Sequence, residues 1–365
     1  MSKRFIGVGT RYKIKDNLKI SKPILLLRSK KSFYLNGACN LIQSFEIKNN
    51  LHEYFDFSND IILSEVKKAY SFFIKKKCFS ILAIGGGSVI DMAKAIKFYA
   101  NYFNTPNKNF FIKENKLANK IPIIAVPTTA GTGSEETHFA TVYYKKKKYS
   151  FSHKDLRPEV AIVDPYFLKT VPKKIFATTG FDAFSQAIES YWSRGSTSRS
   201  RMYSRKAINL IEKNLLDACL KKSSGSSLKM SIASNLSGRA INISKTTAPH
   251  SLSYGINQIL GFPHGHAVAL TLGKFFKINK KKITQRSDKI KFVNLLKLLN
   301  VKNESEAENK WYRLMKLCGL NTNFVSLGLR NKATIEKILK KVNAERLNNH
   351  PVKLEGNDLR HLFLD

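Results

Sequence analysis

Two short segments carry polar side chains at spacings that could build a metal site. Asp182 and Gln186 lie four positions apart in FDAFSQAIESYW, and residues four apart share one face of a helix. His250 and His264 follow in APHSLSYGINQILGFPHGH. Two imidazoles, a carboxylate and an amide oxygen suit a divalent transition metal and leave room for water or substrate. The alternative is that the first pair lies on an exposed polar helix face and that the histidines are ordinary.

Two glycine-containing loops could hold a phosphate. The segment GGGS at 85–88 follows the apolar run SILAI at 80–84, and PTTAGTGSE at 127–135 follows IPIIAVP at 121–127. Glycines allow close approach of the backbone, and a helix N-terminus offers N–H groups to an anion. The first loop matches neither GxGxxG nor a Walker loop, so by itself it could be only a tight turn. Two such loops after parallel strands predict a nucleotide site.

The elements that must position these loops alternate along residues 1–175. Buried strands are predicted at 23–29, 80–84, 121–127 and 160–164, with helices at 62–77 and from about 89 to 98. Residues 141–152 are predicted as a hairpin or loop excursion. Continuous apolar strands separated by helices are typical of a parallel sheet covered on both faces. We therefore predict a Rossmann-like α/β domain over residues 1–175.

The strand patterns stop after Pro165, and helical patterns follow. Helices are predicted at 181–193, 201–221, 227–242 and 332–345. A chain of 365 residues is also too long for one ordinary core. We therefore predict an all-helical second domain over residues 176–365, which would carry the metal site.

The chain is strongly basic, with a net charge of +37. Such a charge can indicate nucleic acid, an anionic membrane or an acidic substrate. The lysines are spread along the whole chain, however, and the aromatic residues follow core periodicity rather than interleaving with basic ones. We expect neither nucleic acid nor membrane as a partner, and we expect the positive field to favour an anionic small molecule.

Composition also bears on the cellular compartment. No apolar run approaches the roughly 18 to 20 residues of a membrane span, and the N-terminal MSKRFIGVGTRYK lacks the apolar core of a signal peptide. The four cysteines form no CxxC pair, so neither a disulfide framework nor a thiolate metal site is predicted. A cytoplasmic protein is expected.

Five motifs in this order, GGGSVIDMAKAI, PTTAGTGSE, VAIVDP, FDAFSQAIESY and PHGHA, resemble the iron-containing (group III) alcohol dehydrogenase family. The resemblance covers nearly the whole chain. It implies an N-terminal domain that binds NAD(P), a helical C-terminal domain that binds Fe²⁺, Zn²⁺ or another divalent metal, and a reaction where the two cofactors meet. It also implies the fold shared with dehydroquinate synthase, and a homodimer.

The same resemblance implies roles for single residues of the second domain. The implied metal ligands are Asp182, Gln186, His250 and His264, and the implied catalytic group is Asp182, His250, His264 and Tyr254. Gln186 and Tyr254 stand where the wider family usually has histidine. An amide oxygen is a poorer ligand than imidazole, so Gln186 would hold the metal weakly. The phenol of Tyr254 could still relay a proton.

The implied cofactor-binding residues lie in the first domain. They are Ser29, Gly85, Gly86, Gly87, Ser88, Asp91, Thr128, Thr129, Thr132, Ser134 and Lys148. Many relatives carry an acidic residue where Ser29 stands, and that residue would bind the ribose 2′-OH and reject a 2′-phosphate. Ser29 is instead flanked by Arg28, Lys30 and Lys31. Both NADH and NADPH are therefore kept, with NADPH favoured.

A narrower resemblance concerns the substrate. RSKKSF, SQAIESYWS, TTAPHSLSY, FPHGHAVALTLG and VNAERLNNHPVKL resemble the subgroup that contains phosphonoacetaldehyde reductases, in which the glutamine, the tyrosine and PHGH are expected. This resemblance implies reduction of phosphonoacetaldehyde to 2-hydroxyethylphosphonate in phosphonate biosynthesis. The sequence does not single out a lysine or arginine that would hold the phosphonate.

The hypothesis is a metal-dependent NAD(P)H oxidoreductase that interconverts an aldehyde and a primary alcohol. One alternative is a non-redox cyclase or lyase on the dehydroquinate-synthase fold that uses bound NAD transiently. Another is a basic nucleic-acid-binding protein. Because both histidines must be neutral to bind metal, activity is expected to fall below about pH 6 to 6.5.

Overall fold

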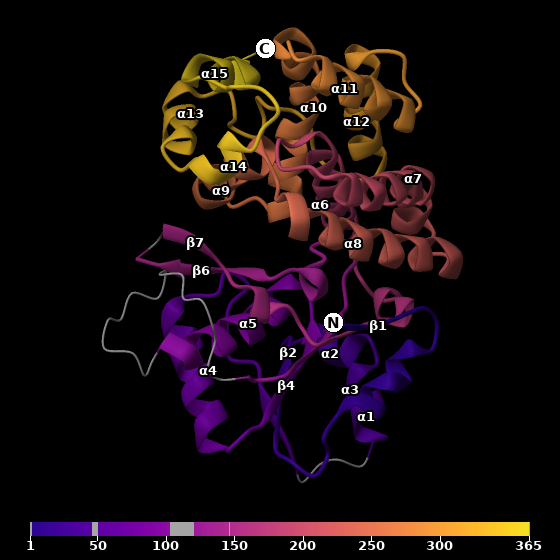
Figure 1. Ribbon diagram of the computed structural model, residues 1–365, viewed down its shortest axis with the longest axis vertical. Helices are drawn as coiled ribbons and strands as arrows, with labels where there is room; N and C mark the ends of the chain where they lie inside the picture. The colour runs from indigo at the N-terminus through magenta and orange to yellow at the C-terminus, as the bar shows by residue number, and fades with distance from the viewer. Residues whose placement is uncertain (1, 46–49, 103–119, 146, 365) are drawn as a thin grey trace. The chain divides into compact units, whose positions relative to one another are not determined.

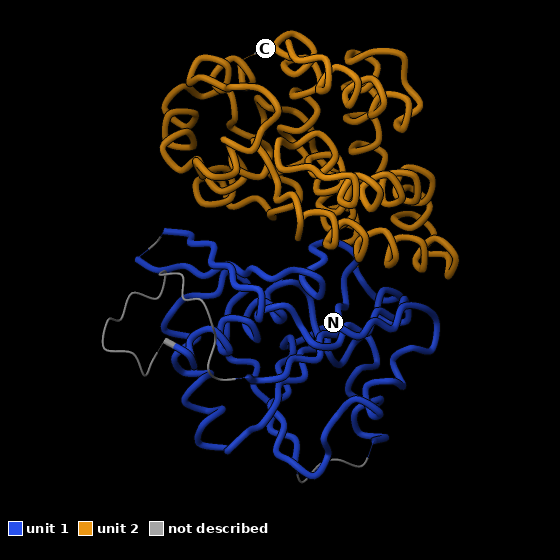
Figure 2. Tube along the Cα trace, viewed as in Figure 1, with its two compact units in different colours: residues 1–171 blue, residues 172–365 orange. Residues whose placement is uncertain are grey.

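The computed structural model describes residues 2–45, 50–102, 120–145 and 147–364. They form two compact units, Met1–Val171 and Pro172–Asp365, which Figure 1 traces along the chain and Figure 2 colours separately. The first unit is built around a parallel sheet, and the described part of the second unit is helical. This arrangement confirms the predicted fold class, an α/β domain followed by an all-helical domain.

The sheet of the first unit has the strand order β1-β8-β5-β4-β2-β3, and every neighbouring pair is parallel. Its strands are β1 (Lys3–Ile6), β2 (Ile24–Arg28), β3 (Leu51–Tyr54), β4 (Ser80–Gly85), β5 (Ile123–Pro127) and β8 (Val160–Val163). Because β2, β4 and β5 are parallel neighbours, the residues that follow these three strands lie at one edge of the sheet.

Helices cover both faces of this sheet. They are α1 (Lys13–Asn17), α2 (Ser32–Leu35), α3 (Ala38–Gln43), α4 (Leu63–Lys75) and α5 (Gly87–Tyr102). The side chains of β4 alternate between two apolar clusters: Ile81 and Ala83 pack with residues of α4 and α5, whereas Leu82 and Ile84 pack with residues of α1, α2 and α3. A strand buried on both faces must be apolar throughout, which is why β4 was predictable as a continuous run.

The outer strands were not predicted from sequence. β1 and β3 lie at the two edges of the sheet, are short and keep most of their side chains partly exposed, so neither shows an apolar run. The excursion expected at 141–152 is an antiparallel hairpin of β6 (Phe139–Tyr144) and β7 (Lys147–Ser152).

The second unit is organised around one buried helix. Its helices are α6 (Lys173–Trp192), α7 (Ser198–Leu220), α8 (Ser224–Ser244), α9 (Ala248–Leu260), α10 (His264–Lys282), α11 (Arg286–Leu298), α12 (Glu304–Leu317), α13 (Lys332–Leu339), α14 (Ala344–Asn348) and α15 (Gly356–Leu364). Nearly all residues of α6 from Phe176 onward are buried, because the helix packs against α7, α8 and α10.

The single helix predicted at 332–345 is wrong. The structure has two helices there, α13 and α14, with a turn at 340–343 between them. Asn343 begins the second helix, since its side chain accepts a hydrogen bond from the backbone N–H of Arg346. The apolar spacing continues across the turn, so periodicity alone did not reveal the break.

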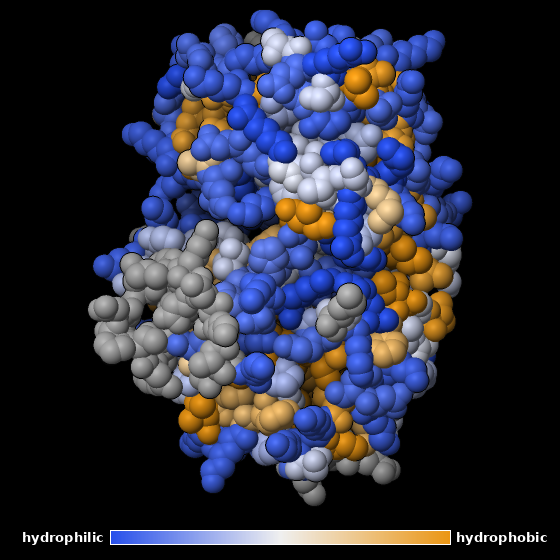
Figure 3. All heavy atoms as spheres, viewed as in Figure 1, coloured by the Kyte–Doolittle hydropathy of each residue, from blue (hydrophilic) through white to orange (hydrophobic). Residues whose placement is uncertain are grey.

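Within the described residues, no helix is both long enough and apolar enough to cross a membrane. Hydrophilic residues cover most of the face seen in Figure 3, and hydrophobic residues form separate smaller patches among them.

Candidate functional site

Three helices of the second unit supply the predicted metal ligands. Asp182 lies within α6, His250 in the first turn of α9, and His264 at the first position of α10. A proline precedes each histidine, at the start of α9 and at the N-cap of α10, where its fixed φ and missing N–H are tolerated. The sequence pattern Pro-His therefore places both imidazoles at helix beginnings.

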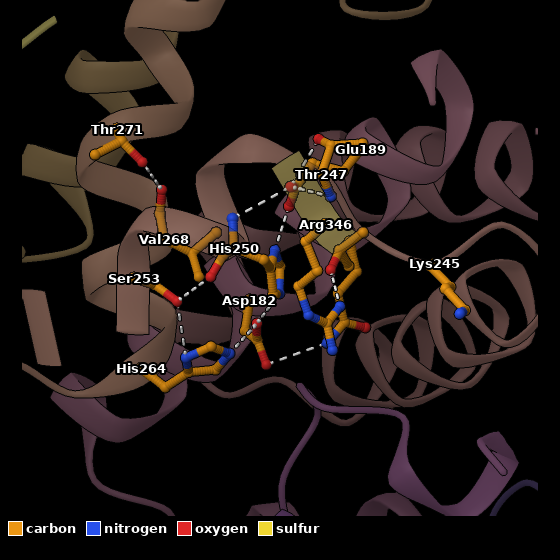
Figure 4. Close-up of polar contacts among 12 residues, drawn as sticks. Asp182, Glu189, Lys245, Thr247, His250, Ser253, His264, Val268, Thr271 and Arg346 are labelled. Atoms are coloured by element: carbon orange, nitrogen blue, oxygen red, sulfur yellow. Dashed lines mark hydrogen bonds and ion pairs between the residues drawn. The ribbon is translucent and has the colours of Figure 1, made fainter. Parts of the chain in front are cut away.

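The three side chains converge on one point, as Figure 4 shows. Oδ1 of Asp182 is 3.3 Å from Nε2 of His250 and 3.8 Å from Nε2 of His264. One donor atom from each residue lies within 4.8 Å of the others. The side chains of Asp182 and His250 are buried, whereas that of His264 is 35% exposed, so the cluster is reachable from one side.

Gly265 makes this approach of α10 to α6 possible. A Cβ atom at that position would lie 2.1 Å from the carbonyl oxygen of Thr178 and 2.9 Å from Cβ of Asp182. Any side chain there would force the two helices apart. The glycine of the PHGH motif therefore has a steric role beside the histidine that precedes it.

Glu189 orients His250 from the other side of the ring. Its buried Oε2 is hydrogen-bonded to Nδ1 of His250, and its Oε1 accepts from the backbone N–H and the hydroxyl of Thr247, each at 2.9 Å. A proton held on Nδ1 by this carboxylate directs the Nε2 lone pair of neutral His250 toward Asp182.

Ser253 has a similar effect on His264. The hydroxyl of Ser253 donates to the backbone carbonyl of His250 at 2.7 Å, and its oxygen lies 3.3 Å from Nδ1 of His264. Since the serine proton is directed at the carbonyl, the serine oxygen is left to accept from Nδ1–H. This tautomer presents Nε2 of His264 to the cluster. Ser253 was not among the predicted site residues.

The pKa values of the metal-free cluster reflect these contacts. Burial would lower the pKa of His250, but the Glu189 carboxylate and the hydrogen bonds to Asp182 and Glu189 outweigh it and raise the pKa to about 9. Burial would likewise raise the pKa of Asp182, yet the hydrogen bond from His250 and the charge of His264 lower it. The sequence-based expectation of an ordinary imidazole therefore does not hold for metal-free His250.

The donor set fits a divalent cation. Oδ1 of Asp182 is buried and faces Nε2 of His250 at 3.3 Å and Nε2 of His264 at 3.8 Å. A cation bound to this oxygen and to both Nε2 atoms would satisfy all three groups, and oxygen and imidazole ligands suit iron or zinc.

Gln186 and Tyr254 lie at the edge of the cluster. Nε2 of Gln186 donates to Oδ2 of Asp182 at 3.2 Å, so in this orientation the amide positions the carboxylate, and its role as a metal ligand stays a prediction. Tyr254 lies one turn after His250 on α9, is 5% exposed and accepts a hydrogen bond from Nε of Arg346 at 3.1 Å. Arg346 was not predicted as a site residue.

The two glycine-containing loops of the first unit contact each other. Gly85 is paired with Pro127 in the register of β4 and β5, and the backbone N–H of Thr128 donates to the carbonyl of Gly85 at 3.0 Å. A Cβ atom at Gly87 would lie 2.6 Å from Cγ2 of Thr132. The loops therefore form one continuous backbone surface at the start of α5, which suits a phosphate-bearing ligand.

A buried polar network fixes the second loop to α5. The Ser134 hydroxyl donates to Oδ1 of Asp91 at 2.6 Å, and Nζ of Lys94 donates to Ser134 and to Thr137, each at 2.8 Å. Burial lowers the pKa of Lys94 to about 8 against the charge of Asp91. Asp91 and Ser134, both predicted as cofactor-binding residues, are thus hydrogen-bonded to each other. Lys94 was missed, although it stands inside the motif GGGSVIDMAKAI.

The other predicted cofactor-binding residues lie at several places in the first unit. Gly86 and Ser88 flank the start of α5, and Thr129 follows β5, so both groups lie at the sheet edge described above. Ser29 follows β2 at the same edge and hydrogen-bonds to Ser32. Lys148 lies elsewhere, in β7, with Nζ 5.7 Å from the ring centre of Tyr143. Cofactor contact by these residues stays a prediction.

Curated relatives with known names match part of this sequence. Aldehyde-alcohol dehydrogenase 2 of Entamoeba histolytica is 32% identical over 268 residues, 68% of this chain and 29% of that protein. Phosphonoacetaldehyde reductase of Streptomyces viridochromogenes is 33% identical over 210 residues, 54% of this chain and 52% of that protein. The matched segments thus span about half, or less, of these curated relatives.

Solved structures match over nearly the full length. Sulfoacetaldehyde reductase from Bifidobacterium kashiwanohense, in complex with NAD⁺, has a TM-score of 0.86 at 30% identity, covering 99% of this chain and 96% of that chain. A 1,3-propanediol oxidoreductase has a TM-score of 0.87 at 23% identity, covering 99% and 97%, and supports the fold alone.

Family models cover both units. The model described as iron-containing alcohol dehydrogenase matches residues 2–165, and that of the C-terminal part of the Fe-containing family matches residues 176–365. Together with the ordered motifs and the fold, these matches show that the chain belongs to the iron-containing alcohol dehydrogenase family.

Proposed function

We propose that this chain is a metal-dependent NAD(P)H oxidoreductase that reduces an anionic aldehyde, phosphonoacetaldehyde, to its primary alcohol. The observation that carries the proposal is the convergence of Asp182, His250 and His264 on one buried point, with donor atoms within 4.8 Å of one another. The two glycine-containing loops of the first unit, which contact each other, would bind the phosphates of the dinucleotide. The family relationship supports a redox reaction over the non-redox alternative.

The residues of the site have separable roles in this reaction. A divalent metal at Asp182, His250 and His264 would supply Lewis-acid polarisation of the carbonyl oxygen while NAD(P)H supplies hydride. Glu189 and Ser253 hold the Nδ1 protons of the two imidazoles and so present their Nε2 atoms to one point.

A proton must reach the carbonyl oxygen once hydride has been delivered. Tyr254 carries a phenolic hydroxyl one helical turn beyond His250, and Arg346 fixes its position. We assign proton donation to this hydroxyl, with water as the alternative source.

The substrate is proposed from the relatives. The names phosphonoacetaldehyde reductase and sulfoacetaldehyde reductase both denote two-carbon aldehydes that carry an acidic group. A net charge of +37 favours the capture of such an anion. A cytoplasmic homodimer is proposed by family resemblance, and sedimentation analysis of the purified protein would test the dimer.

The proposal is tested with purified protein loaded with Fe²⁺ or Zn²⁺. Absorbance of NADPH and of NADH is followed with a panel of aldehydes that includes phosphonoacetaldehyde, and we expect net cofactor oxidation. Oxidation of neither cofactor with any aldehyde would contradict the proposal. Turnover of a substrate without net cofactor consumption would indicate the non-redox cyclase or lyase instead.

Replacing a single ligand tests the metal assignment. His264→Ala should reduce kcat by at least about 1,000-fold, because charge stabilisation at the carbonyl oxygen is lost. Nucleotide affinity, measured by NADPH fluorescence, should stay within about twofold, since the glycine loops belong to the other unit. Turnover that survives this substitution would show that the assignment is wrong.

A further inference from the structure

Two buried thiols of the second unit lie in contact with each other. Cys219 stands in the last turn of α7, and Cys318 directly follows α12. Their side chains are hydrogen-bonded to each other, and both cysteines are free thiols in this structure. The two residues are far apart in the sequence, so cysteine spacing gives no indication of the pair. The fold alone brings them together.

The packing of α7 against α12 explains why the thiols meet. Oε1 of Glu212, on α7, pairs with Nζ of Lys310, on α12, at 2.5 Å. Cys219 lies seven residues after Glu212, and Cys318 lies eight residues after Lys310, which is about two turns along each helix. The ion pair and the thiol contact follow in the same order on both helices. The two helices therefore run in the same direction and bring the cysteines to the same level.

The surroundings of the pair favour the thiolate form of Cys318. Lys173, at the start of α6, is close to this residue, since a Cβ atom at Gly319 would lie 3.7 Å from Cε of Lys173. The hydrogen bond with Cys219 lowers the pKa of Cys318 against the effect of burial, and the charge of Lys173 lowers it further. The same hydrogen bond raises the pKa of Cys219, which keeps its proton. Cys318 is therefore the more nucleophilic sulfur of the two.

The thiols are buried beneath the ends of two helices rather than in the centre of the unit. Leu220 and Leu317, their neighbours in sequence, are 50% and 47% exposed. Gly319 has a φ of +86°, in the left-handed region that commonly ends a helix, so the chain leaves α12 directly after Cys318. The last turns of helices open at low cost in free energy. A molecule as small as hydrogen peroxide can reach Cys318 through such an opening.

We propose that Cys219 and Cys318 form a redox-active pair that hydrogen peroxide oxidises to a disulfide. The Cys318 thiolate attacks one peroxide oxygen, so that an S–O bond forms and the O–O bond breaks, and the departing hydroxide takes up the proton that Cys318 had released. The Cys219 sulfur then attacks the sulfenic sulfur of Cys318, an S–S bond forms, the S–O bond breaks, and hydroxide leaves with the Cys219 proton as water. The two sulfurs lose two electrons, and peroxide is reduced to two molecules of water.

The disulfide would join helices that pack around the segment carrying Asp182. α12 packs against α10, and the ring of Trp311 on α12 lies 5.1 Å from the rings of Phe181 and Phe184, which stand on either side of Asp182 in α6. A cross-link between α7 and α12 closes a loop of about 100 residues and restricts mainly the unfolded chain. The oxidised protein should therefore be more stable than the reduced protein.

Peptide mapping of the oxidised protein tests the inference. The full chain is loaded with Zn²⁺, so that no iron reacts with the oxidant, treated with an excess of hydrogen peroxide, and digested without reductant. We expect a cross-linked peptide that contains Cys219 and Cys318, and its loss after treatment with dithiothreitol. The melting temperature should rise by at least about 5 °C on oxidation and fall again on reduction. If the two thiols stay free, or are oxidised separately without a cross-link, the inference is overturned.

Single substitutions distinguish the roles of the two sulfurs. In Cys219→Ser, dimedone should trap Cys318 as a sulfenic acid, whereas in Cys318→Ser the Cys219 thiol should stay unmodified under the same conditions. Equal trapping in the two variants would contradict the assignment of Cys318 as the attacking sulfur. The matched control is Cys78→Ser. Burial raises the pKa of this thiol of the first unit to about 11, and its removal should leave the cross-link unchanged.

The readouts are masses and melting temperatures, so they do not depend on turnover. If a cysteine variant does not fold, the mapping of the wild-type chain decides the question by itself. A wild type that forms the cross-link but oxidises NAD(P)H with no aldehyde supports this inference and contradicts the proposed function. A wild type that is active as a reductase but forms no cross-link contradicts this inference alone.

Discussion

At the residue scale, the chemistry of the cluster depends on where each imidazole carries its proton. Glu189 and Ser253 contact the Nδ1 atoms of His250 and His264, so the Nε2 atoms of both rings are turned toward Asp182. Neither partner is a ligand, yet both determine which lone pairs are available. Two of our predictions concern this arrangement.

Glu189→Gln should weaken divalent metal binding by about 10- to 100-fold, because the amide no longer provides a negative charge behind the ring. Competition with a zinc chelator measures the affinity directly. The control is Glu336→Gln, which removes a carboxylate that pairs with Arg360 at the surface and should change nothing. Equal affinities in the wild type and in Glu189→Gln would exclude this role of Glu189.

Metal uptake should depend on pH through His250. The pKa of this residue in the metal-free protein is raised to about 9, so the ring is protonated at neutral pH and must lose a proton before Nε2 can bind metal. Affinity should therefore rise by about tenfold per pH unit from pH 7 and level off above pH 9. Calorimetry in buffers of different ionisation enthalpy should detect release of about one proton at pH 7.5.

The same shift affects the stability of the metal-free protein. A raised folded-state pKa of His250 stabilises the fold below the unfolded value near 6.5, and this contribution is lost as the pH rises through about 9.

Metal affinity that is flat between pH 7 and 9, with no proton release, would show that His250 is already neutral. In Glu189→Gln the rise in affinity should end at a lower pH.

At the element scale, the site depends on how closely α10 approaches α6. Gly265→Ala would place a methyl group 2.1 Å from the Thr178 carbonyl, so the helices must separate and displace His264. We expect a loss of roughly 1–3 kcal/mol in the free energy of unfolding and weaker metal binding. Gly225→Ala on α8 is the control, since nothing lies within 4 Å of its Cβ and alanine favours the helix. Similar effects of both substitutions on metal affinity would contradict the steric argument.

The elements also show what could be predicted from sequence. Strands buried on both faces, such as β4, are continuous apolar runs and were predicted, whereas β1 and β3 at the sheet edges are half exposed and were not. The cluster of Asp182, His250 and His264 could be predicted because each of these residues stands within a short sequence motif. Arg346 could not, since its contact with Tyr254 joins residues 92 positions apart and no local pattern marks it.

At the scale of the whole molecule, charge is the dominant property. The net charge of +37 comes from lysines and arginines spread along the chain, so their summed field, rather than a local patch, acts on an approaching ligand. Such a field attracts an anionic aldehyde and is screened by salt, with a Debye length of about 30 Å at 0.01 M and about 10 Å at 0.1 M.

The dependence of kcat/KM on salt concentration tests this long-range effect. For phosphonoacetaldehyde at saturating cofactor, we expect kcat/KM to fall by about three- to tenfold between 0.01 and 0.3 M NaCl, because the rate of encounter decreases as the field is screened. Propanal, which is neutral, should show little change. If salt lowers kcat/KM equally for both aldehydes, the field does not steer the substrate, and the positive charge of the chain has no part in its capture.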